Sequence, residues 1–215
     1  LWRVYSQSAL LCAGATERSI AFENNDRPGI MLAGAMRAYA NRWATAVGDR
    51  IAIFANNDDA HRTAHDLHQL GVEIAAVIDS RPEAPKSDNF EVLAASEVVN
   101  THGRLGINSI DVKTPQGLRQ IQVSALGVSG GWNPNIHLTC HQRGRPEWDA
   151  ALSAFVPSSD LPKALYVAGA ANGKMTTAAA MQDAVTTAMK IAKDCGRKPK
   201  SLAVPKTSDE SASVT

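Results

Sequence analysis

The sequence predicts an α/β protein built around parallel sheets, and two observations lead to this. Two apolar runs far apart in the chain, at residues 9–15 and 164–170, both break into Ala-Gly-Ala. Between them, residues 50–79 follow a strand–helix–strand pattern, the crossover unit of a parallel sheet. Ligands of open α/β sheets bind at the carboxyl ends of the strands, where small residues let them approach the backbone. We therefore expect a Rossmann-like dinucleotide-binding fold, with a β-α-β domain inserted between two segments of an outer domain.

The first outer segment begins with the strand that ends in Ala13-Gly14-Ala15. Residues 24–29, Asn-Asn-Asp-Arg-Pro-Gly, are a dense turn signal and predict a loop. Residues 30–43 are dominated by Ala, Met, Leu and Arg and contain no proline, which favours a helix.

The inserted unit opens with a predicted strand over residues 50–55. Asn and Asp side chains at 56–59 can cap the first turn of a helix, which we expect at about 60–70. Gly71 is placed to end this helix, and residues 72–79 form the second predicted strand.

The rest of the inserted unit is predicted to be largely β. An exposed break at 81–85 precedes residues 90–100, which allow either a strand or a short helix. Residues 106–112 and 118–123 alternate apolar and polar side chains around a turn at 114–117, which predicts a hairpin or meander.

The second outer segment follows. Residues 126–131 lead out of the β region, the second Ala-Gly-Ala strand ends at 168–170, and a long helix is expected at about 176–195. The tail from 196 to 215 is polar, which is typical of a linker or a disordered segment.

These elements predict a division into domains. We expect 1–47 and 129–195 to form a partial outer dinucleotide-binding domain of the FAD/NAD(P)-binding type. Residues 48–128 would form the inserted, nucleotide-binding-like domain with its β-meander. Because the chain opens directly into strand-like sequence without a Met, we expect it to be a piece of a longer polypeptide.

Composition excludes some classes of function. The 215 residues carry a net charge of +1, so no basic field for nucleic acid is present. No apolar run is long enough to span a membrane, and no signal peptide is recognisable. Cys12, Cys140 and Cys195 are odd in number and widely spaced, which argues against a disulfide framework and favours a reducing cytoplasm.

Two clusters of reactive side chains are candidates for a metal site or a catalytic site. His61, His65 and His68 share a helix face at spacings that can hold zinc, but the ligand set is incomplete, and a solvated face is the simpler interpretation. Cys140 and His141 would point to opposite faces of an extended segment, so they do not form a nucleophile pair. The sequence therefore predicts no metal site and no catalytic residue.

The inserted unit lacks a phosphate-binding loop. Residues 56–60 stand where a Gly-x-Gly-x-x-Gly turn would lie, yet they contain no glycine, and Asp58 and Asp59 would repel phosphate. Asp79 ends the second strand, where an acid commonly binds ribose. We interpret Asp79 as the remnant of a lost nucleotide site.

Four segments together resemble the α subunit of heterotetrameric sarcosine oxidase. They are Ala-Gly-Ala-Thr-Glu-Arg at 13–18, Asn-Asn-Asp-Arg-Pro-Gly-Ile-Met-Leu-Ala-Gly-Ala at 24–35, Ser-Gly-Gly-Trp-Asn-Pro-Asn-Ile-His-Leu at 129–138 and Val-Ala-Gly-Ala-Ala at 167–171. The resemblance extends to about residue 195. It implies that the chain is a middle part, because the family's Gly-x-Gly-x-x-Gly unit and its folate-binding domain are missing from it.

The resemblance also implies an activity and its cofactors. The family enzyme demethylates sarcosine oxidatively to glycine, passes the one-carbon unit to tetrahydrofolate and forms hydrogen peroxide. FAD and FMN belong to the β subunit and to the α/β interface, whereas the α subunit holds a non-redox NAD. The expected partners are the β, γ and δ subunits and a small-molecule nucleotide. The fragment itself is expected to be inactive.

One residue favours NAD over FAD in the outer domain. In related flavoproteins the late strand ends in Gly-Asp, and the acid binds the ribityl chain of FAD; here Ala170 offers no acceptor for a hydroxyl. The expected cofactor contacts are Ala13, Gly14, Gly169, Ala170, Met175 and Thr177, the last two in the first turn of the last helix. Two alternatives stay open: a non-catalytic subunit-interaction domain, and the α subunit of a related opine or amine dehydrogenase.

Overall fold

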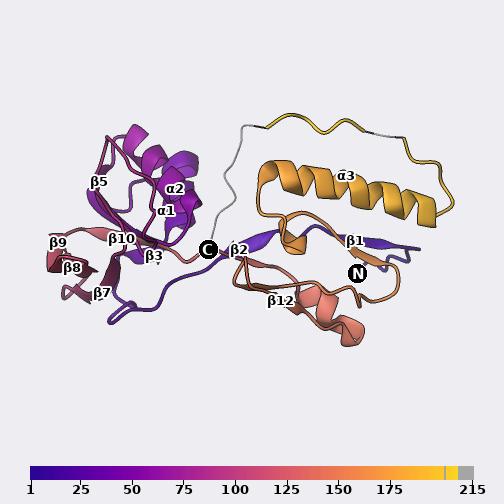
Figure 1. Cartoon of the computed structure of the whole chain (residues 1–215), viewed down its shortest axis with the longest axis horizontal. Helices are drawn as coiled ribbons and strands as arrows, with labels where there is room; N and C mark the ends of the chain where they lie inside the picture. Colours follow the sequence, from indigo (N-terminus) through magenta and orange to yellow (C-terminus); the bar gives the residue numbers. More distant parts are fainter. Residues whose placement is uncertain (201, 208–215) are drawn as a thin grey trace. The chain divides into compact units, whose positions relative to one another are not determined.

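The computed structural model describes residues 1–200 and 202–207, and these form two compact units. The inner unit is Glu17–Gly131, and the outer unit combines Leu1–Thr16 with the chain from Trp132 onward (Figure 1). Part of the predicted linker or disordered tail, at 201 and 208–215, lies outside the described residues.

The inner unit is built on a five-stranded parallel sheet in the order β3-β10-β4-β5-β6. The predicted strand–helix–strand unit is present as β4, α2 and β5, and Asn57 caps α2 by accepting the amide of Ala60 at 3.2 Å. The bounds are β3 Ile30–Leu32, α1 Ala33–Trp43, β4 Arg50–Ala55, α2 Asp58–Gln69, β5 Glu73–Asp79, β6 Val92–Leu93 and β10 Ala125–Ser129.

Two strands of this sheet differ from the prediction. Residues 30–32 form β3 rather than the start of a helix, because they pair in parallel with Leu126–Val128. Residues 126–131 were expected only to lead out of the β region, but Ala125–Ser129 form β10 between β3 and β4. The inner unit consequently begins at Glu17, well before residue 48, since β3 and α1 belong to its sheet and core.

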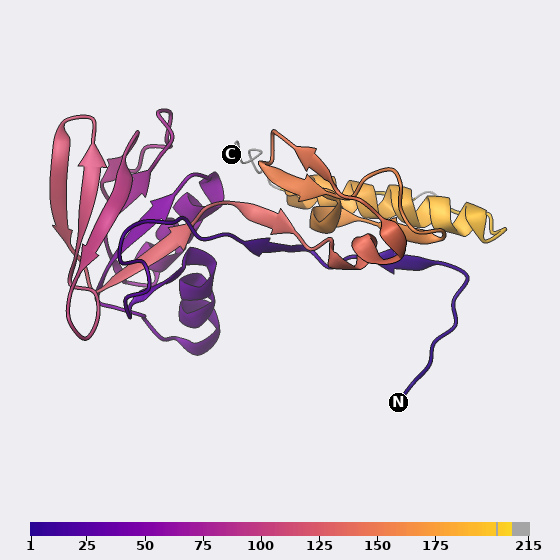
Figure 2. The ribbon, with the colours of Figure 1, turned by 90° about the horizontal axis from the view of Figure 1, so that it is seen from below.

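Both faces of the sheet are covered. Along β4, Ile51, Ile53 and Ala55 pack with α1 and α2, whereas Ala52 and Phe54 face a second cluster. That cluster is closed by a three-stranded antiparallel meander, seen apart from the helices in Figure 2. The meander strands are β7 Glu97–His102, β8 Ser109–Thr114 and β9 Gly117–Gln122, so the predicted hairpin is present.

The outer unit confirms that the two Ala-Gly-Ala runs are neighbours. β1 (Ala9–Leu11) and β14 (Leu165–Val167) pair in parallel, with Leu11 opposite Val167. The helix α3 (Thr177–Asp194) packs against β14 and against the 3₁₀ turn η2 (Gly169–Asn172). The remaining elements are β2 Ala15–Glu17, β11 Trp132–Pro134, the 3₁₀ helix η1 His137–Arg143, β12 Glu147–Asp149 and β13 Ala154–Val156.

Candidate functional site

The candidate site is the edge of the outer unit where β1 and β14 end side by side. Gly14 and Gly169 both have positive φ angles, 70° and 74°, which glycine adopts without steric cost. A Cβ built on Gly14 would meet no atom within 4 Å, and one on Gly169 would meet only the methyl of Ala180 at 3.8 Å. The backbone of both strand ends is therefore open to a ligand.

Asn135 holds the end of β1. Its side-chain amide donates to the carbonyl of Ala13 at 2.9 Å, and its backbone amide donates to the carbonyl of Gly14 at 3.0 Å. Its side-chain oxygen accepts the hydroxyl of Thr16 at 2.8 Å. Three hydrogen bonds from one residue thus fix the first Ala-Gly-Ala turn.

Asp183 holds the end of β14 in the same way. Its carboxylate accepts the backbone amide of Gly169 at 2.9 Å and the side-chain amide of Asn172 at 3.1 Å. Asp183 lies on α3, so this helix determines the shape of the second turn. Sequence reasoning missed both Asn135 and Asp183, although Asp183 is the one acid among residues 177–193.

The segment between η2 and α3 differs from the prediction. Thr177 is the first residue of α3, but Met175 precedes the capping residue Thr176 and lies outside the helix. The amides of Gly173 and Lys174 donate to carbonyls of η2, at 3.0 and 3.1 Å, so they are not free to bind a pyrophosphate. Ala13, Gly14, Gly169 and Ala170 remain together at the strand ends.

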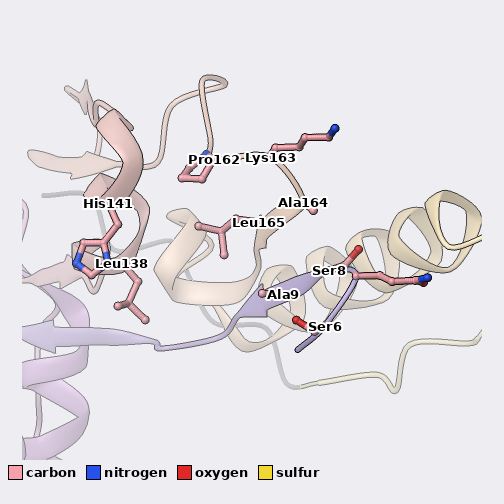
Figure 3. A pocket seen from close by; sticks show the side chains of 10 residues that line it. Ser6, Ser8, Ala9, Leu138, His141, Pro162, Lys163, Ala164 and Leu165 are labelled. Carbon is pink, nitrogen blue, oxygen red and sulfur yellow. The ribbon is translucent and has the colours of Figure 1, made fainter. Parts of the chain in front are cut away.

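A hollow of about 280 Å³ lies at the opposite ends of the same two strands (Figure 3). It is lined by Ser6, Gln7, Ser8, Ala9, Leu138, His141, Pro162, Lys163, Ala164 and Leu165. Because Ala9 and Leu165 begin their strands, this hollow is at the amino edge, whereas ligands of α/β sheets bind at the carboxyl edge. We therefore place the candidate cofactor site elsewhere.

The segment with Cys140 and His141 is η1, a 3₁₀ helix and not the extended strand that was expected. The thiol of Cys140 points to the carbonyl of Ile136 at 3.7 Å, while His141 lines the hollow of Figure 3.

At the carboxyl edge of the inner sheet, Asn57 bridges two strands. This fully buried side chain follows β4, and its amide nitrogen lies 3.1 Å from both the carbonyl and the hydroxyl oxygen of Ser129, at the end of β10. Its oxygen caps α2 at the amide of Ala60. Asn57 thus lies within residues 56–60, the segment that stands where a phosphate-binding loop would be expected.

Asp79 is also fully buried and has protein partners. Nε2 of His61 lies 2.7 Å from one carboxylate oxygen, and Arg81 donates to both oxygens through its backbone amide and its guanidinium. Burial by itself raises the pKa of Asp79, but the hydrogen bonds from His61 and Arg81 outweigh it and lower the pKa below its usual range. The other side of Arg81 pairs with Asp58 at 2.8 Å.

The three histidines of α2 do not converge. His61 is buried against Asp79, so the interpretation of a solvated face was wrong for this residue. The ring centroids of His65 and His68 lie 4.8 and 6.1 Å from the ring centroid of Phe90. Within residues 1–200 and 202–207, no group of three or more His, Cys, Asp or Glu side chains could hold a metal ion.

Solved structures with this architecture are oxidoreductases. Thioredoxin reductase from T. acidophilum superposes with a TM-score of 0.71 at 13% identity, over 89% of this chain and 66% of that one. L-proline dehydrogenase from P. horikoshii gives 0.67 at 19% identity, over 94% and 40%. A protein from Desulfovibrio vulgaris, described as an FAD-dependent pyridine nucleotide-disulphide oxidoreductase, gives 0.56 at 14% identity, over 77% and 46%. The chain therefore has the FAD/NAD(P)-binding, Rossmann-like fold.

Sequence comparison finds relatives of one kind. The chain is 40% identical over 212 residues to the sarcosine oxidase α subunit of Rhizobium meliloti strain 1021, and 35% identical over 224 residues to that of Corynebacterium sp. strain U-96. These alignments take in 98% and 95% of the chain but only 21% and 23% of the relatives. No protein-family model matches. The resemblance expected from the four segments is confirmed: over nearly its whole length, this chain is similar to an internal part of sarcosine oxidase α subunits.

The helices can be compared with the roughly 20 apolar residues that a membrane span requires. In the part of the chain that the structure describes, none is both long and apolar enough to cross a bilayer.

Proposed function

We propose that this chain is the NAD-binding portion of a sarcosine oxidase α subunit, with NAD held at the carboxyl ends of β1 and β14. The observation that carries the proposal is the pair of open, left-handed glycines, Gly14 and Gly169, at adjacent strand ends. Backbone that a Cβ would not crowd is what a dinucleotide needs for close approach.

The residues present fit a dinucleotide at this edge. Ala13, Gly14 and Gly169 would offer backbone contact, and Asn135 and Asp183 keep these turns in one conformation. Met175 and Thr177 lie further along the same segment, before and at the start of α3. The similar structures point mainly to FAD, but the methyl of Ala170 cannot accept a hydroxyl of a ribityl chain, and this favours NAD.

The residues of this chain bind and orient rather than react. NAD in this role supplies no redox step, and no side chain of the chain is assigned one. For the whole enzyme, we propose oxidative demethylation of sarcosine to glycine, with the one-carbon unit passed to tetrahydrofolate and hydrogen peroxide formed. The flavins and the β, γ and δ subunits would be supplied outside this chain, in keeping with relatives that are named as one subunit.

A docking role is the second candidate, and one observation favours it. Trp148 and Phe155 face each other across β12 and β13 with ring centroids 5.1 Å apart, yet they are 58% and 52% exposed. Exposed aromatic pairs are enriched at protein interfaces. This role needs no cofactor, so cofactor binding separates the two candidates.

Thermal unfolding with NAD or FAD tests the proposal. A ligand at about 100 times its Kd stabilises the folded state by about 2.7 kcal/mol, so NAD should raise Tm and FAD should not. Gly169→Val should abolish the NAD effect by filling the open space. Gly71→Val is the matched control, because Gly71 also has positive φ (87°) and open space but lies in the inner unit. An unchanged Tm of the unsubstituted chain with millimolar NAD would exclude NAD binding by this chain.

A further inference from the structure

We propose that the inner unit fills its own nucleotide crevice with side chains, and that this filled crevice binds no dinucleotide but anchors the two ends of the inner unit. The two ends are defined as residues 17–18 and 130–131. The proposal concerns the inner unit alone and does not depend on whether NAD binds the outer unit.

The crevice is located by the strand order. From β4 the chain runs through β5 to β6 on one side, while β10 and β3 lie on the other side. The order therefore reverses between β4 and β10, and such switch points are where open α/β sheets bind their ligands. Asn57 spans this point, because its side chain connects the end of β4 to Ser129 at the end of β10.

Both halves of a dinucleotide site are occupied by the protein. The side-chain oxygen of Asn57 accepts the amide of Ala60 in the first turn of α2, where a pyrophosphate oxygen would bind. Asp79, at the position that would take ribose hydroxyls, is instead bonded to His61 and Arg81. Asp58 completes the closure through Arg81 at 2.8 Å. A nucleotide would have to break these bonds in order to enter.

The same residues reach the two ends of the inner unit. Asn56 donates through its backbone to Ser129 at 3.3 Å and through its side chain to the carbonyl of Gly130 at 3.4 Å. Two bonds join Gly130 and Arg18: the amide of Gly130 donates to the carbonyl of Arg18 at 2.7 Å, and Nε of Arg18 donates to the carbonyl of Gly130 at 3.0 Å. A third bond runs from the amide of Arg18 to the carbonyl of Gly131 at 2.8 Å.

Glu17 extends the polar connection between Asn57 and Ser129 to the end of β3. Its carboxylate accepts the amide of Gly34, in the first turn of α1, at 2.9 Å and also binds the side chain of Ser129. Asn57, Ser129 and Glu17 thus form a continuous polar connection along the ends of β4, β10 and β3. In this chain, the residues of the crevice hold together residues 17–18 and 130–131, where the chain enters and leaves the inner unit.

Amide exchange measured by NMR on the whole chain tests the first half of the proposal. NAD and NADPH, each at millimolar concentration, should leave the exchange rates and shifts of residues 57–61 and 79–81 unchanged. Protection of these amides by either nucleotide would overturn the proposal. Protection confined to residues 13–14 and 169–170 would support NAD binding by the outer unit together with an inner crevice closed to nucleotides. If neither nucleotide protects any amide, the proposed NAD site of the outer unit is excluded, whereas the proposal that the inner crevice is closed to nucleotides is supported.

Asn57→Asp tests the anchoring. An aspartate still caps α2 but cannot donate to Ser129, so the amides of Arg18 and Gly130 should exchange about tenfold faster, which corresponds to about 1.4 kcal/mol. Ser129→Ala removes the hydroxyl that accepts from Asn57 and binds Glu17, so it should also speed the exchange of these two amides. It serves as the test if the aspartate variant does not fold. Thr114→Ala, which removes turn hydrogen bonds between β8 and β9, is the control. Unchanged exchange in both crevice variants, or an equal increase in Thr114→Ala, would overturn the anchoring role.

Discussion

The backbone amide of Gly169 donates a hydrogen bond to the carboxylate of Asp183, fourteen residues further along the chain, at 2.9 Å. The same carboxylate accepts the side-chain amide of Asn172. The left-handed turn at the end of β14 is therefore held by the helix that follows it. Gly169 has no side chain of its own that could brace this turn, so the bracing comes from Asp183 on α3.

Asp183→Ala should destabilise the outer unit by about 1–3 kcal/mol, because the half-buried amide of Gly169 loses its partner. Asp183→Asn keeps the shape of the side chain but not its charge, so its cost should be smaller. Urea unfolding followed by circular dichroism measures both. Gln182→Ala is the control, since Gln182 is the exposed neighbour on α3. A loss below about 0.5 kcal/mol for Asp183→Ala, as for an ordinary surface position, would contradict the bracing role.

Asn135→Asp should loosen the other strand end. Aspartate can still accept the hydroxyl of Thr16, but it cannot donate to the carbonyl of Ala13, which then faces a negative charge. We expect a loss of about 1 kcal/mol in the free energy of unfolding. Thr16→Val removes the other side-chain bond of Asn135 and should cost less, since Thr16 is exposed. Equal stability of Asn135→Asp and the unsubstituted chain would show that the bond to Ala13 does not matter.

The sequence pattern predicted the parts of the fold that local chemistry determines. The cap residues at 56–59 and the alternation along residues 106–112 and 118–123 are local signals. The structure contains both the α2 cap, at Asn57, and the hairpin of β8 and β9. β3 was missed because Ile30-Met31-Leu32 favours a helix in isolation. Its strand conformation comes from pairing with β10, a contact across almost one hundred residues that no local pattern records.

The candidate site was predicted in the same partial way. The two matching Ala-Gly-Ala runs predicted the paired ends of β1 and β14, because an apolar run that ends in small residues is recognisable in the sequence. Asn135 and Asp183 carry no such signal, since their importance depends on where distant segments fold. The inner crevice illustrates a mixed case: the missing glycines, the capping side chains at 56–59 and Asp79 were visible, but the bonds from His61 and Arg81 to Asp79 were not.

Glu17 should make the stability of the inner unit depend on pH. Burial raises the pKa of this carboxyl, and the hydrogen bonds from Ser129 and Gly34 offset this only in part. A raised pKa means that the folded state binds more protons than the unfolded chain. The stability contributed by Glu17 is therefore fully present below the ordinary pKa of about 4.3 and is lost as pH rises above it.

Glu17→Gln removes this dependence, because glutamine stays neutral and its oxygen can still accept the amide of Gly34. Its Tm should therefore lie above that of the unsubstituted chain at pH 7, and the difference should vanish towards pH 4. Glu83→Gln changes the same charge at an exposed position and should show no such trend. A lower Tm for Glu17→Gln than for the unsubstituted chain at pH 7 would contradict this expectation. It would mean that the hydrogen bond from Gly34 to the charged carboxylate contributes more to the free energy of unfolding than the burial of that charge costs.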